Sequence, residues 1–278
     1  MCRILKIITT LLALLAHAGA MADEISVPAW KLAVASGRGV LENPLAGRGK
    51  QETFLLPAFS YYGERFFISN LTAGYNLVEE DSFYIDLVAR PNEDGLYYLA
   101  GDVRVVSLTS LLGLDPYGGD NEPIKVERNV SIVAGPNATL VTDPVDISFS
   151  YFHDITGVHN GSETHLSFNK RYRLFGGAIS WGLGVVNKDA DLVDYYYRLR
   201  DTEMGFNSSL WFNQPEQDDV TDHYTRLSYA YPLTKNVELR LAAKYNRFDM
   251  DGRHAQLMEK SETLSWFVGI QYSIGSEQ

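Results

Sequence analysis

The chain closes on the stretch S-W-F-V-G-I-Q-Y-S-I-G-S-E-Q, residues 265–278. Its large apolar and aromatic residues alternate with small or polar ones, apart from Phe267. Strict alternation of this kind predicts a β-strand with one apolar face. The apolar face consists of Trp266, Val268, Ile270, Tyr272 and Ile274.

The same alternation recurs through the chain, for example at 145–151, 164–172, 179–185, 225–233 and 237–245. Most of these runs are about 9 to 12 residues long, which is the span of a tilted transmembrane strand and exceeds the ~5–6 residues of a usual soluble strand. A soluble β-sandwich would show the same period, so alternation alone does not separate the two architectures.

Three further features favour a membrane barrel. Aromatic residues lie at the ends of the apolar faces, as in the girdles of outer-membrane proteins. Tight turns at 62–64, 134–137, 174–176 and 232–236 alternate with long polar loops at 113–125, 153–162, 187–219 and 249–262. An apolar closing strand also suits a barrel whose last strand must pair with its first, near Trp30–Leu41.

We therefore predict an all-β fold, a single antiparallel up-and-down barrel of about twelve strands. The expected strands are 30–41, 52–61, 65–75, 82–90, 96–107, 125–134, 142–152, 163–174, 177–187, 219–232, 236–248 and 263–274. The segment 96–107 has the weakest pattern, and a barrel without it would have ten strands.

The first 22 residues are expected to be a secretory signal peptide, which leaves 23–278 as the barrel. Arg3 and Lys6 precede an apolar run that ends in small residues at Ala20-Met21-Ala22, and that run is shorter than the ~20 residues that span a membrane. The only cysteine, Cys2, lies in this segment, so no disulfide supports the remainder. The net charge of −11 argues against nucleic-acid binding.

Several segments, in order, resemble the MipA/OmpV family of outer-membrane proteins, the MltA-interacting family. They are LLPAFSYYGERFFISNLTAGYNL at 55–77, SLLGL at 110–114, FHDITGVHNG at 152–161, VDYYYRLRDTEMG at 193–205 and GIQYSI at 269–274. The chain departs from the family's pattern where Ile274 replaces the usual terminal aromatic residue, with four residues after it. The resemblance implies a barrel in the outer membrane of a Gram-negative bacterium.

The resemblance also implies partners. A non-enzymatic scaffold would bring a lytic transglycosylase and a peptidoglycan synthase together, with the short turns and Asp23–Pro28 as the partner face. A narrow channel or a surface adhesin acting through the 187–219 loop is the alternative, and an enzyme in the barrel wall is a third class.

Candidate sites are few. The sequence contains no nucleophile, phosphate-loop or metal-binding motif that predicts catalysis or a cofactor, so no catalytic, metal or cofactor residue is expected. The pair His153-Asp154 with His159 fits a polar hairpin loop better than a metal site. Tyr195, Tyr196 and Tyr197 with Arg198 could bind a sugar or peptide, although an interfacial aromatic belt explains them better.

Overall fold

The computed structural model describes residues 28–99, 103–105, 124–200, 203, 218–250 and 255–276. Outside the described residues lie the expected signal peptide and residues 23–27 of the expected partner face Asp23–Pro28. Parts of the predicted loops 113–125, 187–219 and 249–262 also lie outside them. None of the helices in the described part of the chain is long and apolar enough to cross a membrane.

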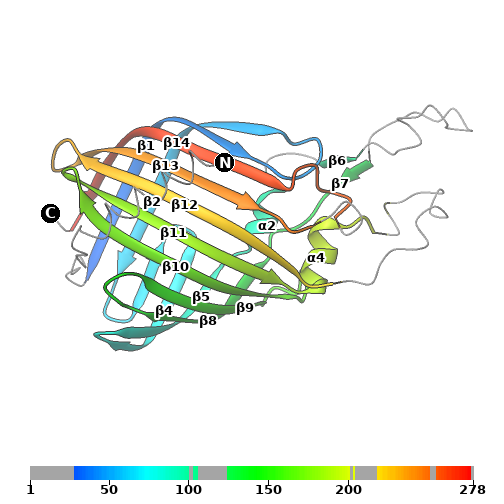
Figure 1. The fold of residues 1–278 in the computed structure, drawn as a ribbon, viewed down its shortest axis with the longest axis horizontal. Coiled ribbons are helices and arrows are strands. Elements are labelled where there is room, and N and C mark those ends of the chain that lie inside the picture. Colours follow the sequence, from blue (N-terminus) through cyan, green and yellow to red (C-terminus); the bar gives the residue numbers. More distant parts are fainter. Residues whose placement is uncertain are drawn as a thin grey trace, which may run out of the picture.

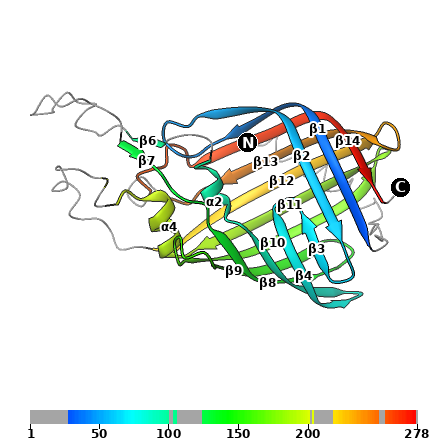
Figure 2. The same cartoon turned by 180° about the vertical axis from the view of Figure 1, so that it is seen from behind.

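Twelve antiparallel strands form a closed barrel, which confirms the predicted fold class (Figures 1 and 2). The wall is closed by β1 pairing with the last strand, β14, and its neighbours otherwise follow the chain order. The strands are β1 (Ala29–Glu42), β2 (Lys50–Tyr62), β3 (Phe66–Ser69), β4 (Thr72–Glu80), β5 (Phe83–Pro91), β8 (Ile132–Leu140), β9 (Asp146–Asp154), β10 (Ser162–Leu174), β11 (Gly177–Lys188), β12 (Val220–Pro232), β13 (Val237–Arg247) and β14 (Glu262–Gly275).

The closing strand, β14, shows how alternating apolar and polar residues form the two faces of the barrel wall. Its five predicted apolar residues point away from the lumen, with side chains exposed on the outer face: Trp266, Val268, Ile270, Tyr272 and Ile274. The residues between them point inward and are buried, among them Phe267 and Gln271. Since side chains alternate with a period of two, the pairing of Ile270 with Ser36 sets the register of the whole seam.

The count of twelve is right, but two of the predicted strands are wrong in detail. The run 65–75 is two strands, β3 and β4, because the chain reverses at Asn70-Leu71 with Asn70 in the left-handed region at a φ of 53°. Asparagine tolerates that conformation and so supports a tight turn inside an apolar run. The described residues of 96–107 lie outside the barrel wall: Leu96 ends a short helix, α2 (Glu93–Leu96), and β6 (Val103–Val105) belongs to a separate two-stranded sheet.

The predicted strand 125–134 and the turn at 134–137 are also corrected. The first residues form β7 (Ile124–Val126), which pairs only with β6, and the supposed turn lies inside β8. Pairing between β8 and β9 is interrupted at Gly135 and Pro136 and then resumes in the same register. A Cβ on Gly135 would lie 2.0 Å from the carbonyl oxygen of Tyr151. The glycine therefore lets β8 and β9 approach each other closely and does not form a turn.

The two ends of the barrel differ. The short turns 63–65, 81–82, 141–145, 175–176 and 233–236 gather at one end of the barrel with the start of β1 and the end of β14 (Figure 1). Helices α2 and α4 (Ala190–Tyr197) lie at the other end (Figure 2). Because short turns face the periplasm in bacterial barrels, the end with α2 and α4 is the outer mouth.

Candidate functional site in the barrel mouth

The outer mouth is occupied by the segment Asn92–Leu99, which we call the plug. After β5 the chain leaves the wall at Pro91, and the side chain of Asn92 caps α2 by accepting hydrogen bonds from the backbone N–H of Asp94 (2.9 Å) and Gly95 (3.2 Å). This capped turn directs the acidic residues Glu93 and Asp94 across the lumen toward β11, β12 and β13.

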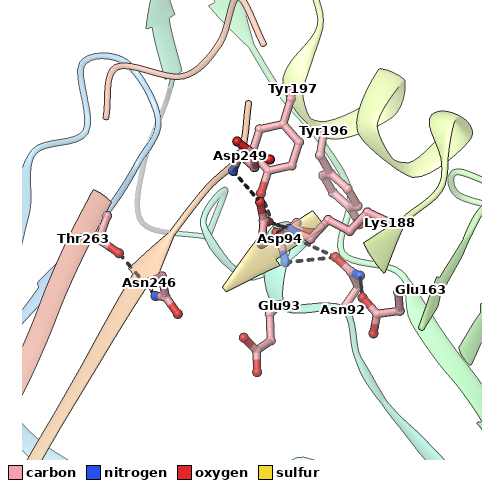
Figure 3. A network of polar contacts seen from close by, with 12 residues as sticks. Asn92, Glu93, Asp94, Glu163, Lys188, Tyr196, Tyr197, Asn246, Asp249 and Thr263 are labelled. Carbon is pink, nitrogen blue, oxygen red and sulfur yellow. Dashed lines mark hydrogen bonds and ion pairs between the residues drawn. The ribbon is translucent and has the colours of Figure 1, made fainter. Parts of the chain in front are cut away.

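Asp94 is the centre of a buried ionic cluster (Figure 3). Its carboxylate accepts an ion pair from Lys188 Nζ of β11 at 2.7 Å and a hydrogen bond from the hydroxyl of Tyr197. Lys188 Nζ also lies 2.7 Å from Asp222 Oδ2 of β12. All three charged side chains are at most 8% exposed, so one ammonium group joins the plug and the wall in a site of low polarity.

A second cluster fixes the start of the plug. Glu163 of β10 is buried and accepts from Asn92 Nδ2 at 3.0 Å and from Arg90 Nη2 at 2.7 Å. His165 Nε2 lies 3.1 Å from the same carboxylate. The amide that caps α2 is therefore itself oriented by a charged group of the opposite wall.

Glu93 makes the third connection, to Lys244 of β13 at 2.7 Å. Burial in the mouth opposes ionisation of Glu93, but the charges of Lys244 and Arg90 outweigh it and lower the pKa of Glu93 to about 2. The Glu93 carboxylate is consequently ionised at neutral pH and holds the inner side of α2.

Above the ionic clusters lies an apolar core that includes the predicted tyrosines. Tyr196 and Tyr197 have no exposed surface and lie on α4, where Tyr196 accepts from the N–H of Ser131 at 3.2 Å and donates to the carbonyl of Asn129 at 3.1 Å. The same core contains Leu45, Tyr98, Val126, Leu192, Val193, Leu199, Val220, Phe248, Met250, Ala255 and Leu257.

The four residues predicted as a loop-binding set are thus divided. Tyr196 and Tyr197 are structural, Arg198 is buried with Asp194 at 3.1 Å, and only Tyr195 keeps a partly exposed ring. Tyr195 contacts the guanidinium groups of Arg128 and Arg200, whose carbons lie 5.7 Å and 4.7 Å from its ring centroid. A ligand that stacks on this set would have only Tyr195 available.

The loop with His153, Asp154 and His159 has its polar groups engaged. Asp154 accepts from the N–H groups of Thr156 (2.8 Å), His159 (2.7 Å) and Asn160 (3.0 Å). Burial lowers the pKa of His159, whose ring nitrogens contact Ser131 Oγ and the N–H of Gly161. No group of three potential metal ligands occurs among the residues that the structure describes.

Inside the barrel, on the inner side of the plug, lies a cavity of about 560 Å³. It extends from Asp146 on β9, at the end with the short turns, to Leu56 on β2. Sequence analysis did not identify this cavity or the ionic clusters. The sequence feature that points to the ionic clusters is the presence of charged residues at lumen-facing positions of several strands, such as Glu163 and Lys244.

A family model described as "MltA-interacting protein MipA" matches residues 36–274. The "Putative outer membrane protein YiaT" of Escherichia coli (strain K12) is 22% identical over 249 residues, which cover 89% of this chain and 92% of the relative.

Among solved structures, OmpT, an outer membrane protein of Vibrio cholerae, is 10% identical with a TM-score of 0.36, covering 80% of this chain and 65% of OmpT. The outer membrane protein OprD of Pseudomonas aeruginosa is 10% identical with a TM-score of 0.36, and the match covers 91% of this chain and 67% of OprD.

The closed antiparallel barrel and the family match over most of its length identify an outer-membrane protein of a Gram-negative bacterium, embedded in the lipid bilayer. This chain therefore belongs to the MltA-interacting protein MipA family.

Proposed function

We propose that this protein is a non-enzymatic scaffold of the outer membrane, which binds a lytic transglycosylase and a peptidoglycan synthase at its periplasmic end. The observation that carries the proposal is the filled outer mouth. The buried cluster of Asp94, Lys188 and Asp222, together with the core around Tyr196 and Tyr197, occupies the position where a porin would be open.

The description of the family model supports the choice of partner, because it refers to an interaction with MltA. The charged groups of the mouth support a non-catalytic role, since each is held by another charged or polar group of the wall. In this proposal the five outward side chains of β14, from Trp266 to Ile274, contact hydrocarbon and anchor the barrel.

The periplasmic turns offer a specific docking residue. Phe175, at the tip of the turn between β10 and β11, is 79% exposed and adopts a φ of 53°. A fully accessible aromatic ring on a two-residue turn is suited to insert into a partner's pocket. Ile155, which is 62% exposed in the loop between β9 and β10 at the opposite end, provides a matched control.

The test is capture of periplasmic proteins from a solubilised cell envelope by the purified barrel, with Phe175→Glu and Ile155→Glu compared. We expect the wild type and Ile155→Glu to retain a lytic transglycosylase and a synthase, and Phe175→Glu to retain about tenfold less, the effect of losing one interface anchor. Equal capture by both variants, or capture of neither partner by the wild type, contradicts the proposal.

The absence of catalysis is tested separately. Purified protein incubated with phospholipid or peptidoglycan should release neither fatty acids nor muropeptides. Release that disappears on a single serine or histidine substitution would establish an enzyme instead.

A further inference from the structure

One part of the barrel wall is incomplete. On one edge β2 pairs with β1 along its length, from Tyr62 with Ala29 to Lys50 with Glu42. On its other edge it pairs with β3 only through Ser60, Tyr61 and Tyr62. In the described part of the chain no strand pairs with 50–58 on that edge.

The pairing ends because β3 is only four residues long. The short hairpin of β3 and β4 reverses at Asn70, and β4 pairs with β5 only up to Ala89. The chain then leaves the wall after Pro91 to enter the lumen. Among the described residues, no strand fills the wall between the first two thirds of β2 and the end of β5, and we call this opening the slot.

Both faces of β2 are accessible beside this unpaired edge. Leu56 points into the cavity and is 37% exposed, while Leu55 beside it points outward and is 59% exposed. Unpaired backbone at membrane depth is tolerated where it is buried in protein or lines a water-filled cavity. Pro57, which lacks an N–H donor, is also typical of a strand with a free edge.

The cavity behind the slot is chemically two-sided. On β2, β1 and β14 it is lined by the apolar residues Leu56, Leu41 and Phe267, and on the next two strands, β13 and β12, by Lys244 and Arg226. Arg226 Nη2 donates to Asn169 Oδ1 at 2.6 Å, and none of the described carboxylates forms an ion pair with Arg226. Arg226 lines the cavity, and a guanidinium group can bind an anionic headgroup with two parallel hydrogen bonds.

We propose that the cavity binds a single-chain anionic amphiphile, such as a long-chain fatty acid, which enters through the slot from the membrane. The hydrocarbon chain lies along Leu56 and Phe267, and the carboxylate is held by Arg226. A volume of about 560 Å³ is within the range of roughly 300–1,000 Å³ that is usual for small-molecule sites. This binding is independent of the scaffold function, because it uses the lumen and not the periplasmic turns.

The experiment uses the full barrel in lipid nanodiscs and titrates cis-parinaric acid, a fluorescent fatty acid, with empty nanodiscs subtracted. Displacement by a saturated fatty acid is compared with displacement by the alcohol of the same chain length. We expect saturable binding in which the acid competes about tenfold better than the alcohol, because a charge-assisted hydrogen bond to Arg226 is lost in the alcohol.

Two matched pairs of variants locate the site. Arg226→Met should weaken binding of the acid about tenfold and leave that of the alcohol unchanged, whereas Arg240→Met, a lumen residue of β13 outside the cavity lining, should change neither. Leu56→Trp should block entry, while Leu55→Trp, on the outer face of the same strand, should not.

Three results would overturn the proposal. The first is no saturable signal above empty nanodiscs. The second is equal competition by acid and alcohol in the wild-type barrel. The third is unchanged binding in a Leu56→Trp barrel that still shows the heat-dependent gel mobility of the folded state. A stable dimer cross-linked along β2 would likewise show that a second copy, and not an amphiphile, occupies the slot.

Discussion

At the scale of single residues, the mouth depends on a few charged side chains that would be costly alone. Lys188 contacts Asp94 and Asp222 at 2.7 Å each, and the pair of carboxylates shares one ammonium group. Glu93 contacts Lys244 from the inner side of α2. Because a buried charge without a partner is strongly destabilising, the buried contacts of Lys188 hold the plug more strongly than the partly exposed pair of Glu93 and Lys244.

Replacement of Lys188 tests this cluster. Lys188→Met should lower the free energy of unfolding by about 3–5 kcal/mol, because two buried carboxylates lose their counter-ion. Lys31→Met is the control, since Lys31 lies 3.9 Å from Glu238 and is half exposed, and should cost about 0–1 kcal/mol. Urea unfolding in detergent, followed by the heat-dependent gel shift, measures both, and equal losses would contradict the cluster's role.

The ion pair of Glu93 predicts that the stability of the protein depends on pH. Its folded pKa of about 2 lies below its usual 4.5, so the ionised carboxylate stabilises the docked plug above pH 4.5. That contribution is lost as the pH falls from 4.5 through about 2. Thermal midpoints measured from about pH 7 to about pH 3 should show that Glu93→Gln is less stable than wild type at neutral pH and that the difference narrows below about pH 4.5.

The matched control for Glu93 is Glu52→Gln. Glu52 pairs with Arg38 on the outer surface of β2 and β1, where both side chains are at least half exposed. The midpoint of this variant should follow that of the wild type across the whole range. A constant difference between Glu93→Gln and wild type down to about pH 3 would show that the ion pair with Lys244 does not hold the plug.

At the scale of elements, the register of β14 determines which side chains meet the membrane. Ile270 is 51% exposed on the outer face and pairs with Ser36 and Leu239. Its neighbour Gln271 points inward, where Nε2 donates to Glu238 at 2.7 Å and Oε1 accepts from Arg240 at 3.1 Å. A shift by one residue would send Gln271 into hydrocarbon and break both contacts.

An arginine scan across the wall tests this register. Ile270→Arg should lower the free energy of unfolding by about 2–4 kcal/mol, the usual cost of a cation on the lipid face near mid-membrane. Ser228→Arg, which places the same side chain on the lumen face of β12 in the cavity lining, should be milder. Folding into lipid vesicles measures both, and a larger loss for Ser228→Arg would show that the faces are assigned the wrong way round.

At the scale of the whole molecule, the barrel is closed at its outer end and open in its side wall. Two neighbouring features of the chain produce these properties. After β5 the chain leaves the wall and fills the mouth, and the reversal at Asn70 ends β3 early, which leaves 50–58 of β2 without a strand partner in the described structure.

Planar bilayer recordings test the closed mouth. The wild-type barrel should show no stable conducting steps, because the plug and the core around Tyr196 fill the outer end. Replacement of the plug, Asn92–Leu99, by a glycine and serine linker of equal length should produce ion-conducting steps. The same replacement in the loop Ile155–Gly161 should not, and large steps in the wild type would show that the mouth is open.

The sequence by itself determined the barrel and its faces. Alternation with a period of two is a local property of an extended chain, so it predicted the outward set from Trp266 to Ile274 and the closure of the last strand on the first. Most of the wall was predicted in this way. The errors at 65–75, 96–107 and 134–137 arose because Asn70, Asn92 and Pro136 have turn chemistry whose outcome depends on neighbouring strands.

Only the tertiary structure decided the mouth, the cavity and the slot. Asp94 and Lys188 are 94 residues apart, and no local pattern shows that a helix cap at Asn92 brings them to 2.7 Å. Tyr196 and Tyr197, which in the sequence could equally line a binding loop, are buried because α4 packs on the plug. Burial and ion pairing depend on distances through space, and those distances exist only after the barrel has closed.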